Sequence, residues 1–132
     1  HVLTDKKGVP LSVVITAANT HDMKAATNTL DSVIVERPLK KQNLCLDKAY
    51  HSNEVEQEIV KRGYIPHIRH RKEKERIFST KHPSRRWVVE RTNSWHNRFR
   101  KLFTRYEKKD ENYLGLVQLA NSIIVYRRII LG

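Results

Sequence analysis

The sequence predicts an α/β protein with a single domain over residues 1–132, and three observations support that class. Alternating apolar and polar residues flank a polar turn that ends at Gly8, a pattern typical of a β-hairpin. Residues 44–46 form a short apolar run of the kind found in buried central strands. Amphipathic segments follow both features, so we expect helices to flank a mixed sheet and to bury one core.

Capping residues and periodicity place the remaining elements. Thr20 and Asp22 can cap a first helix, whose apolar residues extend to about Glu36. Gly63 is expected to end a second helix, and Pro66 favours an edge position for the strand that follows. The predicted elements are strands at residues 1–4 and 9–16, a helix at 22–36, a strand at 44–46, a helix at 53–62, a strand at 64–68, and helices at 86–102 and 111–131.

The helix predicted at 86–102 contains no Gly or Pro and has two different faces. One face is an apolar stripe that can pack on a core, made of Val88, Thr92, Trp95, Phe99 and Leu102. The opposite face holds a single carboxylate among cations and amides, its members being Arg86, Glu90, Asn93, Asn97 and Lys101. A lone acid in such surroundings indicates a metal or phosphate site. The alternative is a surface pair between Glu90 and Arg86, worth about 0.3–0.5 kcal/mol.

Asp47 directly follows the predicted buried strand. A carboxylate at the carboxyl end of a buried strand is a placement that α/β enzymes use for metal and phosphate chemistry. The alternative is an Asp that caps a helix or stabilises a turn, which is a common role for this residue type. Cys45, in the same apolar run, is expected to be buried and unreactive.

Positive charge is concentrated in one part of the chain, which carries a net charge of +12. Residues 67–109 contain fifteen Lys or Arg against four Asp or Glu, and the rest of the chain is nearly neutral. A basic block of this kind is the electrostatic feature expected of a nucleic-acid surface. The alternative is a solvated basic face or a disordered arm. Trp87, Trp95 and Phe99 interrupt the charges at helical spacing, which favours a folded surface.

Composition argues against several other classes of protein. With one cysteine the chain can form no internal disulfide, so a cytoplasmic protein is expected. The seven histidines have no zinc-site spacing, and no apolar run approaches the roughly 20 residues that a membrane helix needs. No Ser/His/Asp or Cys/His arrangement suggests a covalent nucleophile, and no association with a membrane is expected.

Three segments combine these residues in a distinctive order. They read Asn-Thr-His-Asp at 19–22, Leu-Asp-Lys-Ala-Tyr at 46–50, and Arg-Trp-Val-Val-Glu-Arg-Thr at 86–92, followed by Trp95 and by Arg-Phe-Arg at 98–100. Together they closely resemble the DDE transposases of bacterial insertion sequences, especially the insertion sequence 5 family, over essentially the whole chain. The resemblance implies a ribonuclease H-like core in which two Asp and one Glu bind divalent metal ions.

Carried over by position, the resemblance makes Asp47 the second catalytic acid and Glu90 the third, both as ligands of Mg²⁺ or Mn²⁺. Arg86 matches an Arg that the family has four residues before the Glu. This chain has Pro83 and Asn97 where the related motif has a Tyr and a Lys or Arg. The residues expected to bind DNA are Arg86, Arg91, Arg98, Arg100 and Lys101.

The first catalytic Asp of the family has no counterpart in this chain. In the family it lies on a first strand upstream of the hairpin, whereas Asp5 is in the hairpin turn and Asp22 caps a helix. We therefore expect this chain to be the C-terminal part of a catalytic domain, with a sheet that lacks its first strand. An upstream polypeptide would supply the missing Asp, and the chain alone would be inactive.

The resemblance implies a transposase that nicks DNA at the terminal inverted repeats of an insertion sequence and transfers the strands into target DNA. In such enzymes two metal ions stabilise the attacking and leaving oxygens of an in-line phosphoryl displacement. The active complex is expected to be a homo-oligomer, bound to the nucleoid in a bacterial cytoplasm. Two alternatives remain: a non-catalytic DNA-binding fragment that binds the ends or modulates the full enzyme, and, on charge alone, an RNA-binding protein.

Overall fold

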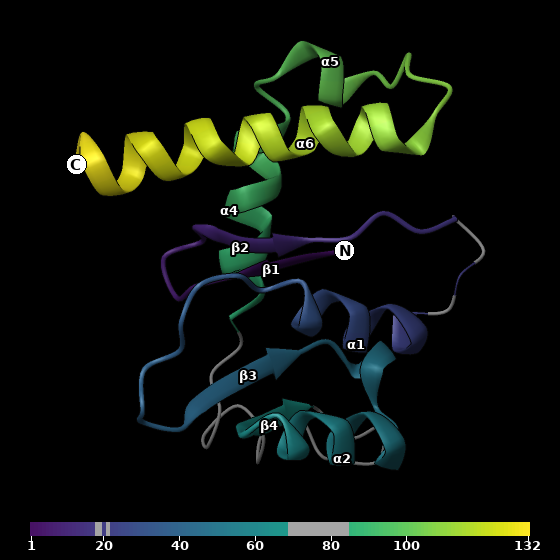
Figure 1. Cartoon of the computed structure of the whole chain (residues 1–132), viewed down its shortest axis with the longest axis vertical. Coiled ribbons are helices and arrows are strands. Elements are labelled where there is room, and N and C mark those ends of the chain that lie inside the picture. The colour runs from purple at the N-terminus through teal and green to yellow at the C-terminus, as the bar shows by residue number, and fades with distance from the viewer. Residues whose placement is uncertain (18–19, 21, 69–84) are drawn as a thin grey trace.

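The computed structural model describes residues 1–17, 20, 22–68 and 85–132, and shows a mixed α/β protein (Figure 1). The α/β class predicted from the sequence is therefore confirmed. Part of the basic block at residues 67–109 falls on residues 69–84, which lie outside the described residues. The elements are β1 (Val2–Thr4), β2 (Pro10–Val13), α1 (Asp22–Asp31), β3 (Gln42–Leu46), the 3-10 helix η1 (Lys48–Tyr50), α2 (Asn53–Lys61), β4 (Tyr64–Ile68), α4 (Arg86–His96), α5 (Arg100–Phe103), α6 (Asp110–Val125) and the π-helical turn η2 (Tyr126–Ile130).

The four strands form two separate two-stranded sheets. β1 and β2 pair antiparallel as the predicted hairpin, whereas β3 and β4 pair in parallel. The single mixed sheet expected from the sequence is thus not formed by the described strands. Leu3 of β1 and Leu46 of β3 pack against the same core, but their strands share no hydrogen-bonded ladder. Each of these two strands therefore keeps an unpaired edge.

The hydrophobic core lies between the parallel sheet and the helices α1 and α2. α2 begins where Ser52 Oγ accepts a hydrogen bond from Val55 N at 3.4 Å. It ends just before Gly63, whose φ of 77° lies in the left-handed region that glycine adopts freely. These two caps hold the apolar side of α2 against the strands. The buried members of the core are Ala26, Leu30, Leu44, Val55, Ile59 and Ile68.

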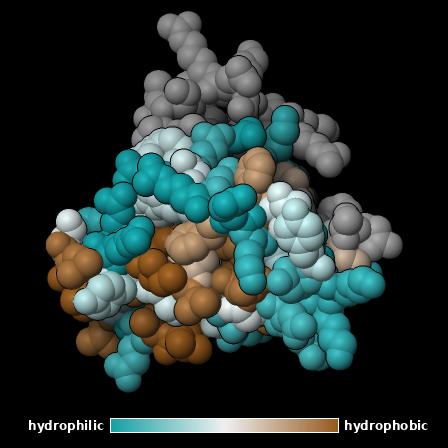
Figure 2. Space-filling model, turned by 90° about the horizontal axis from the view of Figure 1, so that it is seen from above, coloured by the Kyte–Doolittle hydropathy of each residue, from teal (hydrophilic) through white to brown (hydrophobic). Residues whose placement is uncertain are grey.

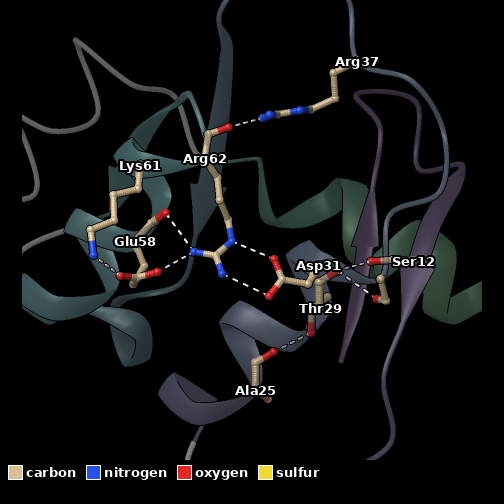
Figure 3. Close-up of polar contacts among 9 residues, drawn as sticks. Ser12, Ala25, Thr29, Asp31, Arg37, Glu58, Lys61 and Arg62 are labelled. Atoms are coloured by element: carbon tan, nitrogen blue, oxygen red, sulfur yellow. Dashed lines mark hydrogen bonds and ion pairs between the residues drawn. The ribbon is translucent and has the colours of Figure 1, made fainter.

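Arg62 joins the end of α1 to the end of α2 (Figure 3). Its Nε and Nη2 donate to the Asp31 carboxylate at 2.8 and 3.0 Å, and its Nη1 donates to Glu58 Oε2 at 2.5 Å. Hydrogen bonds from Arg62 lower the pKa of Asp31, and hydrogen bonds from Lys61 and Arg62 lower the pKa of Glu58. Both carboxylates are accessible to solvent, so this network mainly orients the two helices.

α1 also contacts the hairpin and so bridges the two sheets. Ser12 Oγ of β2 donates to Thr29 O at 2.7 Å, which satisfies a buried hydroxyl (Figure 3). α1 ends at Asp31, five residues before the predicted end at Glu36, and Ile34 is 94% exposed. Beyond Asp31 the chain leaves the core, so its apolar residues have no surface on which a helix could pack.

α4 packs on the hairpin through a contact between Thr92 and Gly8. The side chain of Thr92 is fully buried at 0% exposure, and its Oγ1 donates to Gly8 O at 2.5 Å. Gly8 has a φ of +83°, and a Cβ at this position would lie 3.1 Å from Val88 O. Glycine therefore permits both the turn and the close approach of the helix. Val88 is buried and Trp95 half-buried, so the predicted apolar stripe does face the interior.

The helix predicted at 86–102 is interrupted. α4 ends at His96, and Phe99 adopts an extended backbone with φ −90° and ψ 102° before α5 begins at Arg100. No Gly or Pro marks this break, so the sequence pattern does not indicate it. The change of direction brings Leu102 against α6, where Tyr113 Oη donates to Leu102 O at 3.5 Å.

α6 contacts both β2 and α4, and buries Val117, Ala120 and Ile124 on its inner face. The helix predicted at 111–131 is confirmed, and its apolar residues Ile129 and Ile130 are exposed. Figure 2 shows hydrophobic side chains gathered on the surface of this side of the molecule. None of the helices in the described ranges is both long and apolar enough to cross a membrane. The exposed large apolar residues of the last helix are Leu119, Tyr126, Ile129, Ile130 and Leu131.

We predict that Thr92→Val lowers the free energy of unfolding by about 1–3 kcal/mol, because Gly8 O would be left without its buried donor while the side-chain shape is kept. Urea unfolding followed by circular dichroism measures this change. Thr92→Ser is the matched control, since it retains the hydroxyl and removes one methyl group. Equal stability of the valine variant and the parent would show that the hydroxyl contributes nothing.

A second prediction concerns acid. The folded-state pKa values of Asp31 and Glu58 are depressed from 3.8 and 4.5, so their contribution to stability is present above those values. It disappears as the pH falls through the lower folded-state values. As the pH is lowered below about 4, the variant Arg62→Gln should therefore lose less of its free energy of unfolding than the parent does. Urea unfolding at several pH values measures this difference. Arg98→Gln removes the same charge from an exposed side chain without a described ion pair, and should leave the pH profile unchanged.

Candidate metal ligands and nucleic-acid surface

Asp47 is exposed and lies immediately after β3, as the sequence predicts. It occupies the N-cap position of η1, but its side chain makes no capping hydrogen bond. Its main-chain carbonyl accepts from Tyr50 N at 3.0 Å, so the backbone forms the turn without the carboxylate. Tyr50 Oη in turn shares a hydrogen bond of 3.2 Å with His1 Nδ1, which ties η1 to the start of the hairpin. The Asp47 carboxylate is thus not used as a cap.

Glu90 lies in the middle of α4, with its side chain 59% exposed. Its Oε1 accepts from Arg86 Nε at 3.0 Å, one helical turn earlier. The surface pair that the sequence offered as an alternative is therefore formed. Such a pair leaves the second carboxylate oxygen accessible, because each carboxylate has several acceptor positions. The contact is compatible with either interpretation of Glu90.

Asp47 and Glu90 belong to different elements, Asp47 at the start of η1 and Glu90 in the middle of α4. No hydrogen bond or ion pair connects Asp47 with α4 in the described part of the chain. No group of three or more His, Cys, Asp or Glu residues that could hold a metal ion is found among residues 1–17, 20, 22–68 and 85–132. Asp5 uses its carboxylate to accept from Lys7 N and Val9 N, both at 2.8 Å, so it stabilises the hairpin turn. Convergence of Asp47 and Glu90 on one metal site stays a prediction.

The charge of Arg85, at the start of α4, acts on the thiol of Cys45 in β3. Desolvation raises the pKa of its thiol, and the charge of Arg85 partly opposes that rise. Arg85 directly precedes α4, so the N-terminal end of this helix lies within electrostatic range of β3. Cys45 itself is exposed, which contradicts the expected buried thiol. Its raised pKa keeps the thiol protonated at neutral pH, so it is poorly suited to act as a nucleophile.

The five residues expected to bind DNA are all exposed. They do not lie on one helical face, because the break at residues 97–99 changes the direction of the chain. Arg86 and Arg91 belong to α4, Arg98 lies in the break, and Arg100 and Lys101 belong to α5. Arg91 is held by two contacts: its Nη1 donates to Lys7 O at 3.4 Å, and its guanidinium lies 4.5 Å from the ring centroid of Trp87.

A cavity of about 480 Å³ lies beside this helix and was not expected from the sequence. Asn93, His96 and Asn97 of the α4 region line it, together with residues that follow β2 and with Tyr113 of α6. His96 Nε2 is paired with Asn121 Oδ1 at 2.6 Å. The only sequence signal for this cavity was the amide-rich face of the helix. The opposing walls come from segments that are distant in the sequence, and hydrophobic periodicity cannot predict that these segments lie together.

Comparison with known proteins identifies the class. The model of the family described as "Transposase DDE domain" matches residues 1–124, so the chain belongs to that family. The chain is also similar to the transposase assigned to insertion sequence element IS402 of Burkholderia cepacia, with 29% identity over 132 residues. The match covers 96% of this chain and 61% of that relative. No solved structure matches the chain significantly.

The basic surface can be tested by salt dependence. Replacing Arg98, Arg100 and Lys101 together with Gln should weaken DNA binding, because fewer counterions are released from the duplex. The slope of log affinity against log salt should become shallower by about 0.9 for each phosphate that the variant no longer neutralises. Fluorescence anisotropy with a labelled duplex at several salt concentrations measures both quantities. Replacement of the exposed Lys24, Lys40 and Lys41 with Gln changes the net charge equally, and should leave the slope unchanged. A slope unaffected by the first triple variant would place the DNA surface elsewhere.

Proposed function

We propose that this chain is the C-terminal part of the catalytic domain of a DDE transposase, which cleaves DNA at insertion-sequence ends and joins those ends to target DNA. The observation that carries the proposal is the family match over residues 1–124. Asp47 after β3 and Glu90 on α4 support it, because both carboxylates are exposed. In the sequence, these two residues match the motifs that contain the family's second and third catalytic acids.

Asp47 and Glu90 would hold the divalent metal, Mg²⁺ or Mn²⁺. Carboxylate oxygens are the hard ligands that these ions prefer, and the Asp47 carboxylate has no competing cap contact. When bound, the ions would polarise the phosphate and favour an attacking water or 3′-hydroxyl. Arg86, paired with Glu90 at 3.0 Å, would limit the rotamers of that carboxylate and keep positive charge near the DNA backbone. The electrostatic link between Arg85 and Cys45 supports an approach of α4 toward the end of β3.

We further infer a ribonuclease H-like sheet that is completed by an upstream polypeptide carrying the first Asp. β1 and β3 both line one core, yet neither is hydrogen-bonded to the other. An added strand between them would pair two unsatisfied edges and would convert the two sheets into one mixed sheet. The chain spans 61% of the length of the IS402 relative, so that relative contains sequence that could include such a strand.

The proposed partners are the terminal inverted repeats, target DNA and further copies of the protein. The basic helix α4, its continuation α5 and the break between them would contact DNA phosphates. The exposed apolar side of α6 supports contact with another polypeptide, because large exposed apolar patches mark interaction surfaces (Figure 2). A homo-oligomer in the active complex would use such a surface.

A second candidate function is a non-catalytic fragment that binds transposon ends or modulates the full enzyme. The ion pair between Arg86 and Glu90, at 3.0 Å, is compatible with this candidate, because it gives the carboxylate a partner without a metal. This candidate shares the basic surface and differs only in the metal site. Metal-dependent cleavage therefore distinguishes the two.

We predict that the chain alone binds transposon ends without nicking them, and that nicking appears when the upstream segment is supplied. The absence of one of three carboxylates removes a ligand from a two-metal site and disturbs both ions together. The assay follows conversion of supercoiled plasmid carrying the ends, with and without Mg²⁺. Asp47→Asn and Glu90→Gln should each reduce nicking by the completed protein to background and leave end binding intact.

Glu54→Gln is the matched control, because it neutralises an exposed carboxylate on α2 that no described contact uses. It should nick at the parental rate. Robust nicking by the chain alone would contradict the need for an upstream Asp. Full nicking by the completed protein with Asn at position 47 or Gln at position 90 would contradict the assignment of the acids.

A further inference from the structure

Trp87 is an exposed indole in a basic part of the surface. It lies in the first turn of α4 and is 49% exposed, while the adjacent Val88 is buried at 6%. Arg85 and Arg86 precede it directly in the sequence, and both are exposed. Large aromatic side chains usually stabilise a protein through burial, and a side chain in this position contributes little to the core.

Arg91 covers part of this indole. Its guanidinium lies 4.5 Å from the Trp87 ring centroid, a distance at which a cation and an aromatic ring attract each other. The same guanidinium donates to Lys7 O at 3.4 Å, so the hairpin turn also restrains it. The stack is thereby preorganised, and the residue Trp87 is 49% exposed.

Trp95 provides an internal comparison. Arg128 lies 4.4 Å from the Trp95 ring centroid, so the distance between cation and ring is nearly the same in the two stacks. Trp95 is half-buried and its stack joins α4 to the turn η2, which gives it a structural role. Trp87 and Arg91 come from the same helix, four residues apart, and their stack joins no two helices. The exposed stack is therefore available for a ligand.

We propose that Trp87 and Arg91 form a stacking site for an unpaired base of single-stranded DNA; this rests on the proposed DNA-binding function. The π-face of a base can stack on an exposed indole, and the arginines beside it can neutralise the adjacent phosphates. Bases inside a duplex present only their edges, so the site favours unpaired nucleotides. Glu90 follows Trp87 by three residues on α4, about 4.5 Å along the helix axis. The stacked base would thus lie next to the candidate catalytic acid.

The experiment measures binding of the full chain to labelled oligo(dT) and to a labelled duplex of equal length, by fluorescence anisotropy. Trp87→Ala should weaken oligo(dT) binding by about tenfold or more and leave duplex binding and the salt slope unchanged, because stacking releases no counterions. Trp87→Phe should retain most of the affinity. Arg91→Lys keeps the charge but removes the planar guanidinium, so it should also weaken oligo(dT) binding. Trp95→Phe is the matched control and should change neither affinity.

Intrinsic fluorescence gives an independent readout. Oligo(dT) should quench the tryptophan fluorescence of the variant Trp95→Phe, in which Trp87 is the remaining indole. It should not quench the fluorescence of Trp87→Phe. Circular dichroism confirms that each variant is folded. Unchanged oligo(dT) affinity in Trp87→Ala overturns the proposal, as does equal weakening of duplex and single-strand binding. Loss of self-association in Trp87→Ala, with oligo(dT) affinity intact, overturns it in favour of a protein interface. If the parent binds the duplex but not oligo(dT), only this inference fails; if it binds neither, the proposed DNA surface fails as well.

Discussion

The buried hydrogen bond between Thr92 and Gly8 is the interaction on which the arrangement of this protein depends. It joins residues 84 positions apart and holds the helix that carries Glu90 against the hairpin. Two requirements meet there. The turn needs a residue that tolerates a φ of +83°, and the helix needs a neighbour without a side chain. Glycine satisfies both, and the threonine hydroxyl satisfies the carbonyl that the close approach removes from water.

The two candidate acids are positioned by different parts of the fold. Glu90 is held by the hairpin through α4, whereas Asp47 follows a strand whose core is braced by α1, α2 and Arg62. α1 is the main bridge between these parts, through its contacts with both the hairpin and α2. The spacing between the acids therefore depends on how the two sheets are held relative to each other. An added strand that pairs with both β1 and β3 would fix the position of one sheet relative to the other.

α4 combines several roles within three turns because a helix presents successive residues to different directions. Val88 and Thr92 are buried and provide the packing, and Glu90 and Arg86 form an exposed ion pair. Trp87 and Arg91 form an exposed stack on a third side. A substitution in this helix should accordingly affect either stability or ligand binding, depending on the direction in which its side chain points. That separation makes the helix well suited to mutational dissection.

Local pattern by itself determined most of the elements of this protein, because capping residues and apolar spacing act over a few positions. Gly63 indicated the end of α2, alternation indicated the hairpin, and Asp47 directly follows β3, as the sequence predicted. The two faces of α4 were also correct, including the exposure of Glu90. The family was thus predictable from the sequence motifs, whereas a metal site formed by Asp47 and Glu90 stays a prediction.

Only the tertiary structure decided where helices stop and which edges remain open. α1 ends at Asp31 because the chain then leaves the core, and α4 breaks before α5 to bring Leu102 against α6. Neither event has a local marker in the sequence, since both depend on a surface supplied by distant residues. The division into two sheets has the same origin, because strand pairing requires a neighbour that local pattern cannot provide.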